Sequence, residues 1–244
     1  MKTSAAQEHN TGNKTVPRTR PFVTLSYAQS LDGCIALSPG CPCPLSSENS
    51  LKITHRLRSE HDAILIGIGT ALADDPTLTV RHVTGRSPRP VVIDTNLRLP
   101  LYCNMIKNNP LPVWIATGQG ADKKKVSAFR ERNVRIIQVP PRDNGWLDLE
   151  ALLRKLKNSG INNLMVEGGT GIISSFINEQ LVDKVILTIC PVYLSGQPSY
   201  RKSPGDIRAS SLPRLEVTGH FSSGEDIIIT GYPIWKRKDL QEKE

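Results

Sequence analysis

Short apolar runs and amphipathic stretches alternate along this chain from residue 21 to residue 235. Continuous short apolar runs are typical of strands that are buried on both faces of a parallel sheet. They predict strands at 22–28, 63–67, 90–94, 113–117, 134–139, 163–167, 184–189 and 226–230. Helical spacing of apolar residues predicts helices at 50–59, 121–132, 148–159 and 170–179. The order predicts an α/β fold with a mainly parallel central sheet and helices on both faces.

The end of the chain departs from this alternation. No helical pattern separates 184–189 from 226–230, so we expect an antiparallel edge at the C-terminal end of the sheet. The 244 residues are enough for one α/β domain, and no repeat or linker interrupts 21–235. The sequence therefore predicts a single domain at 21–235, a disordered polar tail at 1–20 and a charged tail at 236–244.

The charge balance is basic, with a formal net charge of +8 at pH 7 and a pI of about 9.4. The Lys and Arg residues are spread out and do not alternate with aromatic residues, which favours small phosphorylated ligands over nucleic acid. There is no apolar stretch of the roughly 18 residues that a membrane span needs, and the N-terminus lacks the apolar core of a secretory signal. We therefore predict a cytoplasmic protein without a membrane partner.

The five cysteines do not predict a metal site. Cys41 and Cys43 form a CxC pair, but a metal site would need two further ligands and the other cysteines are scattered. Reduced thiols are the interpretation that fits a cytosolic protein.

Ligands of open parallel sheets bind where the strands end, and the strand at 63–67 ends in a glycine turn. Gly67 and Gly69 would let a ligand approach the backbone, and Thr70 and Asp74 would supply a hydroxyl and a carboxylate. The alternative interpretation is a glycine turn followed by a helix stop at 74–76.

A second glycine turn follows the strand at 163–167. Glu167 ends that strand, Gly168 and Gly169 precede the predicted helix at 170–179, and Gly171 lies in its first turn. Unpaired N–H groups at a helix N-terminus bind phosphate or pyrophosphate. The glycine spacing is not GxGxxG, so a standard Rossmann fingerprint is not predicted.

Other positions are ambiguous when each is taken alone. Asp32 and Thr95 follow strands, but both also fit ordinary turns. Arg58 could bind a phosphate through two N–H groups, or it could lie on a solvated helix face. His61 and His82 are expected at the surface. No P-loop, GxSxG, HExxH or zinc-deaminase pattern is present.

In combination, these segments resemble the reductase family of riboflavin biosynthesis, which has a dihydrofolate-reductase-like fold. The resemblance rests on YAQSLDG (27–33), HDAILIGIGTALADDP (61–76), LTVR (78–81), RPVVID (89–94), VEGG (166–169) and PVYLSG (191–196). The block GxGTxLADDP at 67–76 is the most specific of these motifs.

The resemblance implies NADPH as cofactor, a small phosphorylated pyrimidine as substrate, and a homodimer. The positions that match cofactor contacts are Thr70, Asp74, Thr95, Gly168, Gly169, Thr170, Gly171 and Ile172. Arg58, Arg81 and Glu167 match substrate contacts, with the two arginines toward the ribose phosphate. Glu167, Asp32 and bound water are the candidates for supplying a proton, and the resemblance implies no metal.

The implied reaction converts a ribosylamine to a ribitylamine by hydride transfer to C1′. Ser26 stands where deaminase-fused bacterial members have a lysine, and Pro44 stands where they tend to have an aromatic residue. Ser26 and the absence of a deaminase segment are similar to the fungal and archaeal single-domain type. The predicted substrate is therefore 2,5-diamino-6-ribosylamino-4(3H)-pyrimidinone 5′-phosphate, with 5-amino-6-(5-phosphoribosylamino)uracil as the alternative.

Two rival functions fit the same fold. One is a dihydrofolate-reductase-like enzyme acting on a pterin, and the other is a non-catalytic module that binds nucleotides or RNA. Arg58 and the Asp-Asp-Pro block favour the phosphorylated substrate over the pterin.

Overall fold

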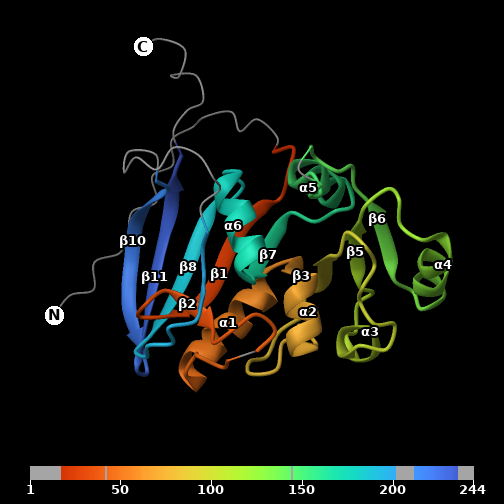
Figure 1. Ribbon diagram of the computed structural model, residues 1–244. Helices are drawn as coiled ribbons and strands as arrows, with labels where there is room; N and C mark the ends of the chain where they lie inside the picture. The colour runs from red at the N-terminus through yellow and green to blue at the C-terminus, as the bar shows by residue number, and fades with distance from the viewer. Residues whose placement is uncertain (1–17, 42, 144, 202–211, 236–244) are drawn as a thin grey trace, which may run out of the picture.

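Nine strands form the central sheet of the protein, in a computed structural model that describes residues 18–41, 43–143, 145–201 and 212–235. The strands are β1 (Phe22–Ser30), β3 (Ala63–Gly67), β4 (Arg89–Ile93), β5 (Trp114–Thr117), β6 (Arg135–Gln138), β7 (Asn163–Gly168), β8 (Lys184–Cys190), β10 (Arg214–Ser223) and β11 (Asp226–Ile234). Their order across the sheet is β10-β11-β8-β1-β7-β3-β4-β5-β6 (Figure 1). The strands from β8 to β6 are parallel, whereas β11 and β10 are antiparallel additions at one edge.

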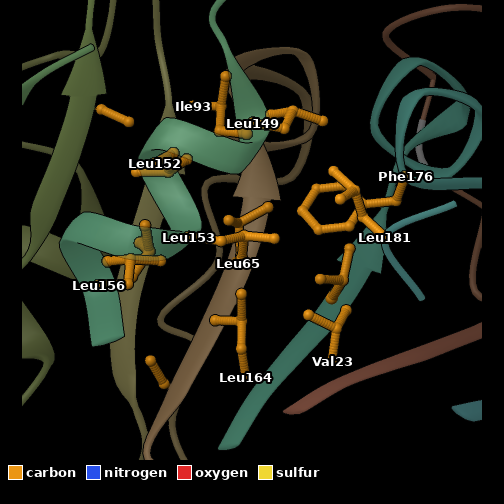
Figure 2. Packing of buried hydrophobic residues seen from close by; sticks show 14 of the residues in the cluster. Val23, Leu65, Ile93, Leu149, Leu152, Leu153, Leu156, Leu164, Phe176 and Leu181 are labelled. Carbon is orange, nitrogen blue, oxygen red and sulfur yellow. The ribbon is translucent and has the colours of Figure 1, made fainter. Parts of the chain in front are cut away.

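Helices cover both faces of this sheet. They are α1 (Glu48–Glu60), α2 (Ile68–Asp74), α3 (Asn104–Asn108), α4 (Lys123–Glu131), α5 (Leu149–Asn158) and α6 (Thr170–Asn178). On one face, Leu152 and Leu153 of α5 point toward Leu65 of β3 (Figure 2). On the other, the neighbouring residue Ile64 belongs to a second core with Phe129 of α4. Adjacent β3 residues therefore face opposite helical layers, as expected for a strand buried on both faces.

The predicted fold class is confirmed, and each predicted strand and helix is present within a few residues of its expected bounds. Five elements were not predicted: α2, α3, β10, and the short pair β2 (Cys34–Ala36) and β9 (Gln197–Pro198). Most side chains of β10 are exposed, so its sequence lacks the apolar run that marks a buried strand. The antiparallel edge was expected with one strand, and it contains two.

Two arginines that precede residue 21 bind the same aspartate. Arg20, assigned by sequence to the tail, forms a two-point ion pair with Asp183, with Nη1–Oδ2 at 2.6 Å and Nη2–Oδ1 at 3.0 Å. Arg18 also donates to Asp183. The rest of the predicted N-terminal tail and the tail at 236–244 lie outside the described residues. In the part of the chain that is described, no helix has the length and apolar character of a membrane span.

Candidate active site

The predicted site residues gather along one edge of the sheet. Strands β1, β7, β3 and β4 are neighbours and run parallel, so their carboxyl ends lie together. Asp32 follows β1, Glu167 and Gly168 end β7, and Thr95 follows β4. Ligands of open α/β sheets bind at this edge. The topology therefore brings together residues that are far apart in the sequence.

The two glycine turns are in direct contact. The N–H of Gly169 donates to Oγ1 of Thr70 at 2.9 Å, which joins the end of β7 to the first turn of α2. Gly168 has a φ of +112°, a region that L side chains rarely adopt, and a Cβ there would lie 2.9 Å from Cδ1 of Ile173. A Cβ on Gly67 would lie 2.7 Å from Cγ1 of Ile172. Close packing therefore favours glycine at both positions, and backbone conformation favours it at Gly168 as well.

The first turn of α6 has the features of an anion site. Gly169 is its N-cap, and among the described residues no side chain caps that turn. The hydroxyl of Thr170 is engaged elsewhere, since it donates to the carbonyl of Pro198 at 2.5 Å and accepts from Nε2 of Gln197 at 2.8 Å. A Cβ on Gly171 would meet no described atom within 4 Å. This open helix N-terminus fits the phosphates of a dinucleotide.

The β4 end of the site is shaped by a buried carboxylate. Asp94 is fully buried, and its Oδ2 accepts the N–H of Leu99 at 2.8 Å, which holds the turn that contains Thr95. The carbonyl of Thr95 accepts from Oγ1 of Thr117 at 2.9 Å. Asp74, at the end of α2, is exposed. The next residue, Asp75, has a left-handed φ of +39° and ends the helix, which agrees with the alternative interpretation of 74–76 as a helix stop.

Arg58 and Glu167 form the strongest polar contact of the site. Nε and Nη2 of Arg58 lie 2.7 Å from Oε1 and 2.8 Å from Oε2 of Glu167, and both side chains are mostly buried. Nη1 of Arg58 also donates to the carbonyl of Thr79 at 3.2 Å. Burial opposes the charge on Arg58, but the facing carboxylate outweighs it and raises the pKa of the guanidinium. Two of the three predicted substrate residues therefore contact each other directly.

Arg81 lies beside a histidine that the sequence did not mark as functional. The N–H of Arg81 donates to Nδ1 of His55 at 2.9 Å, and Nη1 of Arg81 donates to Oγ1 of Thr77 at 3.2 Å. His55 is 2% exposed and packs edge-on against His82, with ring centroids 4.5 Å apart. Burial, then the nearby charges of Arg58, His82 and Arg81, lower the pKa of His55 to about 4.

Asp32 is an acceptor for several donors. Its Oδ1 accepts from Oγ of Ser30 at 2.5 Å and from the N–H of Leu194 at 3.1 Å, and its Oδ2 accepts from the N–H of Ser195 at 2.6 Å. These hydrogen bonds lower the pKa of Asp32 to about 2, and the bond from Ser30 has the largest effect. The geometry favours Asp32 as an anchor for the segment at 194–195.

The sequence-based expectation that His61 lies at the surface is wrong. His61 is buried, with Nδ1 2.6 Å from the carbonyl of Leu57 and Nε2 3.0 Å from Oγ1 of Thr24. His82 is exposed, as expected. The spacing in the sequence could have marked His55 as a candidate site residue. It lies three residues before Arg58 on one helix and therefore shares its face.

A cavity of about 300 Å³ lies at the opposite end of the sheet. Its lining includes Phe22, Asn163 and Lys184, the first residues of β1, β7 and β8. It is therefore separate from the carboxyl edge that carries the site.

Comparisons with known proteins show the family of this chain. The family model described as the RibD C-terminal domain matches residues 21–229. The chain is 36% identical over 216 residues to the 2,5-diamino-6-ribosylamino-4(3H)-pyrimidinone 5′-phosphate reductase of Methanothermobacter thermautotrophicus, covering 86% of this chain and 97% of the relative.

Two solved structures bear on the fold. The riboflavin biosynthesis reductase Rib7 of Saccharomyces cerevisiae superposes with a TM-score of 0.73 at 30% identity, covering 91% of this chain and 93% of that chain. The dihydrofolate reductase of Enterococcus faecalis superposes with a TM-score of 0.51 at 12% identity, covering 87% of this chain and 96% of that one. The second likeness concerns the fold alone, and it confirms the predicted dihydrofolate-reductase-like architecture.

Proposed function

Because this chain belongs to the RibD C-terminal domain family, we propose that it reduces 2,5-diamino-6-ribosylamino-4(3H)-pyrimidinone 5′-phosphate to its ribityl form with NADPH. The observation that carries the proposal is the arrangement at one sheet edge. An open helix N-terminus at Gly169 suits the phosphates of a dinucleotide. Glu167, which pairs with Arg58, directly precedes the glycine turn that leads into this helix. A cofactor and a phosphorylated substrate can thus meet there.

The cofactor half of the site consists of the two glycine turns and the β4 end. The backbone of 168–172 would bind the cofactor phosphates, with Thr70 holding Gly169 in position. Thr95 and Asp74 would bind the remainder of the cofactor. When bound, NADPH supplies the hydride that reduces C1′ of the opened ribosyl group. The chain's own contribution is to align the two reactants and to exclude competing reactions.

The substrate half consists of Arg58, Arg81 and Glu167. The two cationic side chains suit the ribose phosphate, since guanidinium groups match phosphate oxygens geometrically. Glu167 forms an ion pair with Arg58, so its carboxylate would hold that guanidinium in place for the substrate. The low pKa of Asp32 disfavours it as the proton donor. Glu167 is held as a carboxylate against Arg58, so bound water is the donor that these contacts favour among the three candidates.

The diamino compound is the proposed substrate because the relative from Methanothermobacter thermautotrophicus carries that name and is covered over 97% of its length. Ser26, where fused bacterial members have a lysine, is buried in β1. A buried hydroxyl does not supply the charge that a lysine would, in keeping with the single-domain type of enzyme.

We further propose a homodimer and a cytoplasmic location. Support for the dimer comes from the antiparallel edge, where β10 and β11 expose the large apolar side chains Val217, Phe221, Ile227, Tyr232 and Ile234. The register places Phe221 and Ile227 on opposite faces, so apolar side chains are exposed on both faces of this sheet edge. Exposed apolar residues at a sheet edge suit a protein interface. Sedimentation of the wild-type chain beside a Val217→Lys and Ile227→Lys double variant would test the dimer.

The test of function is an assay of NADPH oxidation by the full chain, in which the absorbance of the reduced nicotinamide is measured over time. The diamino and the amino-uracil ribosylamine phosphates are supplied separately, with NADH and dihydrofolate in parallel reactions. Turnover of the diamino compound with NADPH is expected. Preference for the amino-uracil would reverse the substrate assignment, turnover of dihydrofolate alone would favour the pterin reductase, and RNA binding without any oxidation would favour the binding module.

A further inference from the structure

Helix α1 holds the segment that carries Arg81 at two backbone points. Nη1 of Arg58 donates to the carbonyl of Thr79 at 3.2 Å, and Nδ1 of His55 accepts the N–H of Arg81 at 2.9 Å. The two α1 side chains are three residues apart and therefore lie on one face of the helix. One helix face thus fixes both a donor and an acceptor of the same short segment.

The contact requires a neutral imidazole. Nδ1 of His55 accepts a backbone proton, so the ring proton must be on Nε2. The surroundings favour this form, since His55 is 2% exposed and faces the cationic side chains of Arg58 and Arg81 together with His82. A protonated ring would lose the acceptor and add a further positive charge to this group.

We infer that His55 is a positioning residue that fixes the backbone at Arg81 and so aims the Arg81 guanidinium at the phosphate of the substrate. This inference rests on the proposed function, because it takes Arg81 as a phosphate ligand. His55 itself need not touch the substrate. The Arg81 side chain is exposed and has one hydrogen bond among the described residues, to Thr77. If the backbone at Arg81 lost its contact with His55, this one bond would not hold the guanidinium in a single position.

The test compares His55→Leu, which removes the acceptor, with His55→Asn, whose amide oxygen can accept the same N–H. In His55→Leu we expect KM for the phosphorylated substrate to rise roughly tenfold, as a buried unpaired donor predicts, while kcat and KM for NADPH change little. His55→Asn should restore most of the loss. The variant His55→Leu with Arg81→Ala should bind substrate no more weakly than Arg81→Ala alone, since residues that act through one another are not additive.

A matched control is His61→Leu. His61 is also buried and hydrogen-bonded beside α1, but it contacts Leu57 and Thr24, away from Arg81. This variant should lower thermal stability and leave the substrate KM unchanged. If His61→Leu and His55→Leu raise KM equally, the effect is general destabilisation and the inference is wrong.

A binding measurement separates this inference from the proposed function. Calorimetric titration with ribose 5-phosphate probes the phosphate site without turnover, and we expect His55→Leu to weaken its binding roughly tenfold relative to wild type. Wild-type turnover with an unaffected His55→Leu would overturn the inference alone. Weakened ribose 5-phosphate binding in a chain without any reductase activity would support the inference and overturn the proposed function.

Discussion

Arg58 and Glu167 form a two-point ion pair that joins helix α1 to the end of strand β7, with N–O distances of 2.7 and 2.8 Å. The side chains are only 12% and 17% exposed, so each charge depends on the other for its compensation. The pair fixes the carboxylate next to the glycine turn. The proposed substrate half and cofactor half of the site therefore meet at adjacent residues of β7.

Replacing Glu167 should reduce both activity and stability. Glu167→Gln leaves the charge of Arg58 without its partner, so we expect the free energy of unfolding to fall by about 2 kcal/mol, less than for a fully buried pair. We expect kcat/KM for the ribosylamine to fall at least roughly tenfold. Denaturant unfolding and steady-state kinetics measure the two effects. The control is Glu150→Gln, which breaks an exposed pair with Arg154 and should change stability by less than about 0.5 kcal/mol.

The hydroxyl of Thr70 should matter for cofactor binding. Thr70→Val keeps the shape but removes the acceptor for the N–H of Gly169, a loss of about 1 kcal/mol. We expect the Kd for NADPH to rise roughly fivefold, as measured by fluorescence titration, with Thr70→Ser close to wild type. Thr54→Val is the control, because that hydroxyl bonds to the α1 carbonyl of Ser50. An unchanged Kd in Thr70→Val would remove Thr70 from the cofactor site.

Much of this architecture was predictable, because buried strands carry a strong local signal. The parallel strands from β8 to β6 are short apolar runs. A short apolar run that is bounded by turn residues is typical of a buried strand. Strand β10 was not predictable in this way, since an exposed edge strand needs no apolar face. The site was predictable at its glycines, where the backbone demands a residue type, and from the family resemblance.

The contacts between site residues were not predictable. Pattern analysis took Arg58 and Glu167 as separate candidates, and only the pairing of β3 with β7 and the position of α1 bring them together. His61 was misassigned because a single histidine carries no periodic signal, and its burial depends on Thr24 in a distant strand. Asp32 gave a turn signal, whereas its role as an acceptor for the segment at 194–195 follows from tertiary structure.

A substitution at Gly171 can distinguish a role in cofactor binding from a role in stability. An added Cβ would meet no described atom within 4 Å, and alanine is favoured over glycine within a helix by up to about 1 kcal/mol. Gly171→Ala should therefore raise the melting temperature slightly. If the cofactor phosphates lie against this turn, the same variant should raise KM for NADPH severalfold. Ser175→Ala, farther along α6, is the control and should leave KM unchanged. A Gly171→Ala enzyme with normal KM would move the phosphates away from α6.

The low pKa of His55 predicts a pH dependence of stability. The folded-state pKa is about 4, below the ordinary 6.5, so between these values the unfolded chain binds a proton that the folded chain does not. Stability should therefore fall as the pH is lowered through this window, by up to about 1.4 kcal/mol per pH unit from this group. His55→Asn should show a shallower fall in urea unfolding across the same window. Parallel curves for the two proteins would contradict the prediction.

Asp32 should act through the segment that it anchors. Asp32→Asn removes the charge that accepts from Leu194 and Ser195, so we expect faster proteolytic cleavage at 192–196 and a lower kcat/KM. The shape of the pH–rate profile should not change, because a group with a pKa of about 2 does not titrate in the working range. Loss of a limb of that profile in Asp32→Asn would instead identify Asp32 as the proton donor.

The position of β1 has a consequence for how the protein is made. Among the described strands, β1 is synthesised first, yet its neighbours β7 and β8 come late in the chain. Phe22 pairs with Asn163, and Thr24 pairs with Lys184. The apolar β1 segment lacks both of its hydrogen-bonding partners until β7 is synthesised, and it lacks β8 until residue 190 is reached. Such distant pairing predicts slow folding and a nascent chain prone to aggregation, and an expression host should yield more active protein when chaperones bind the early segment.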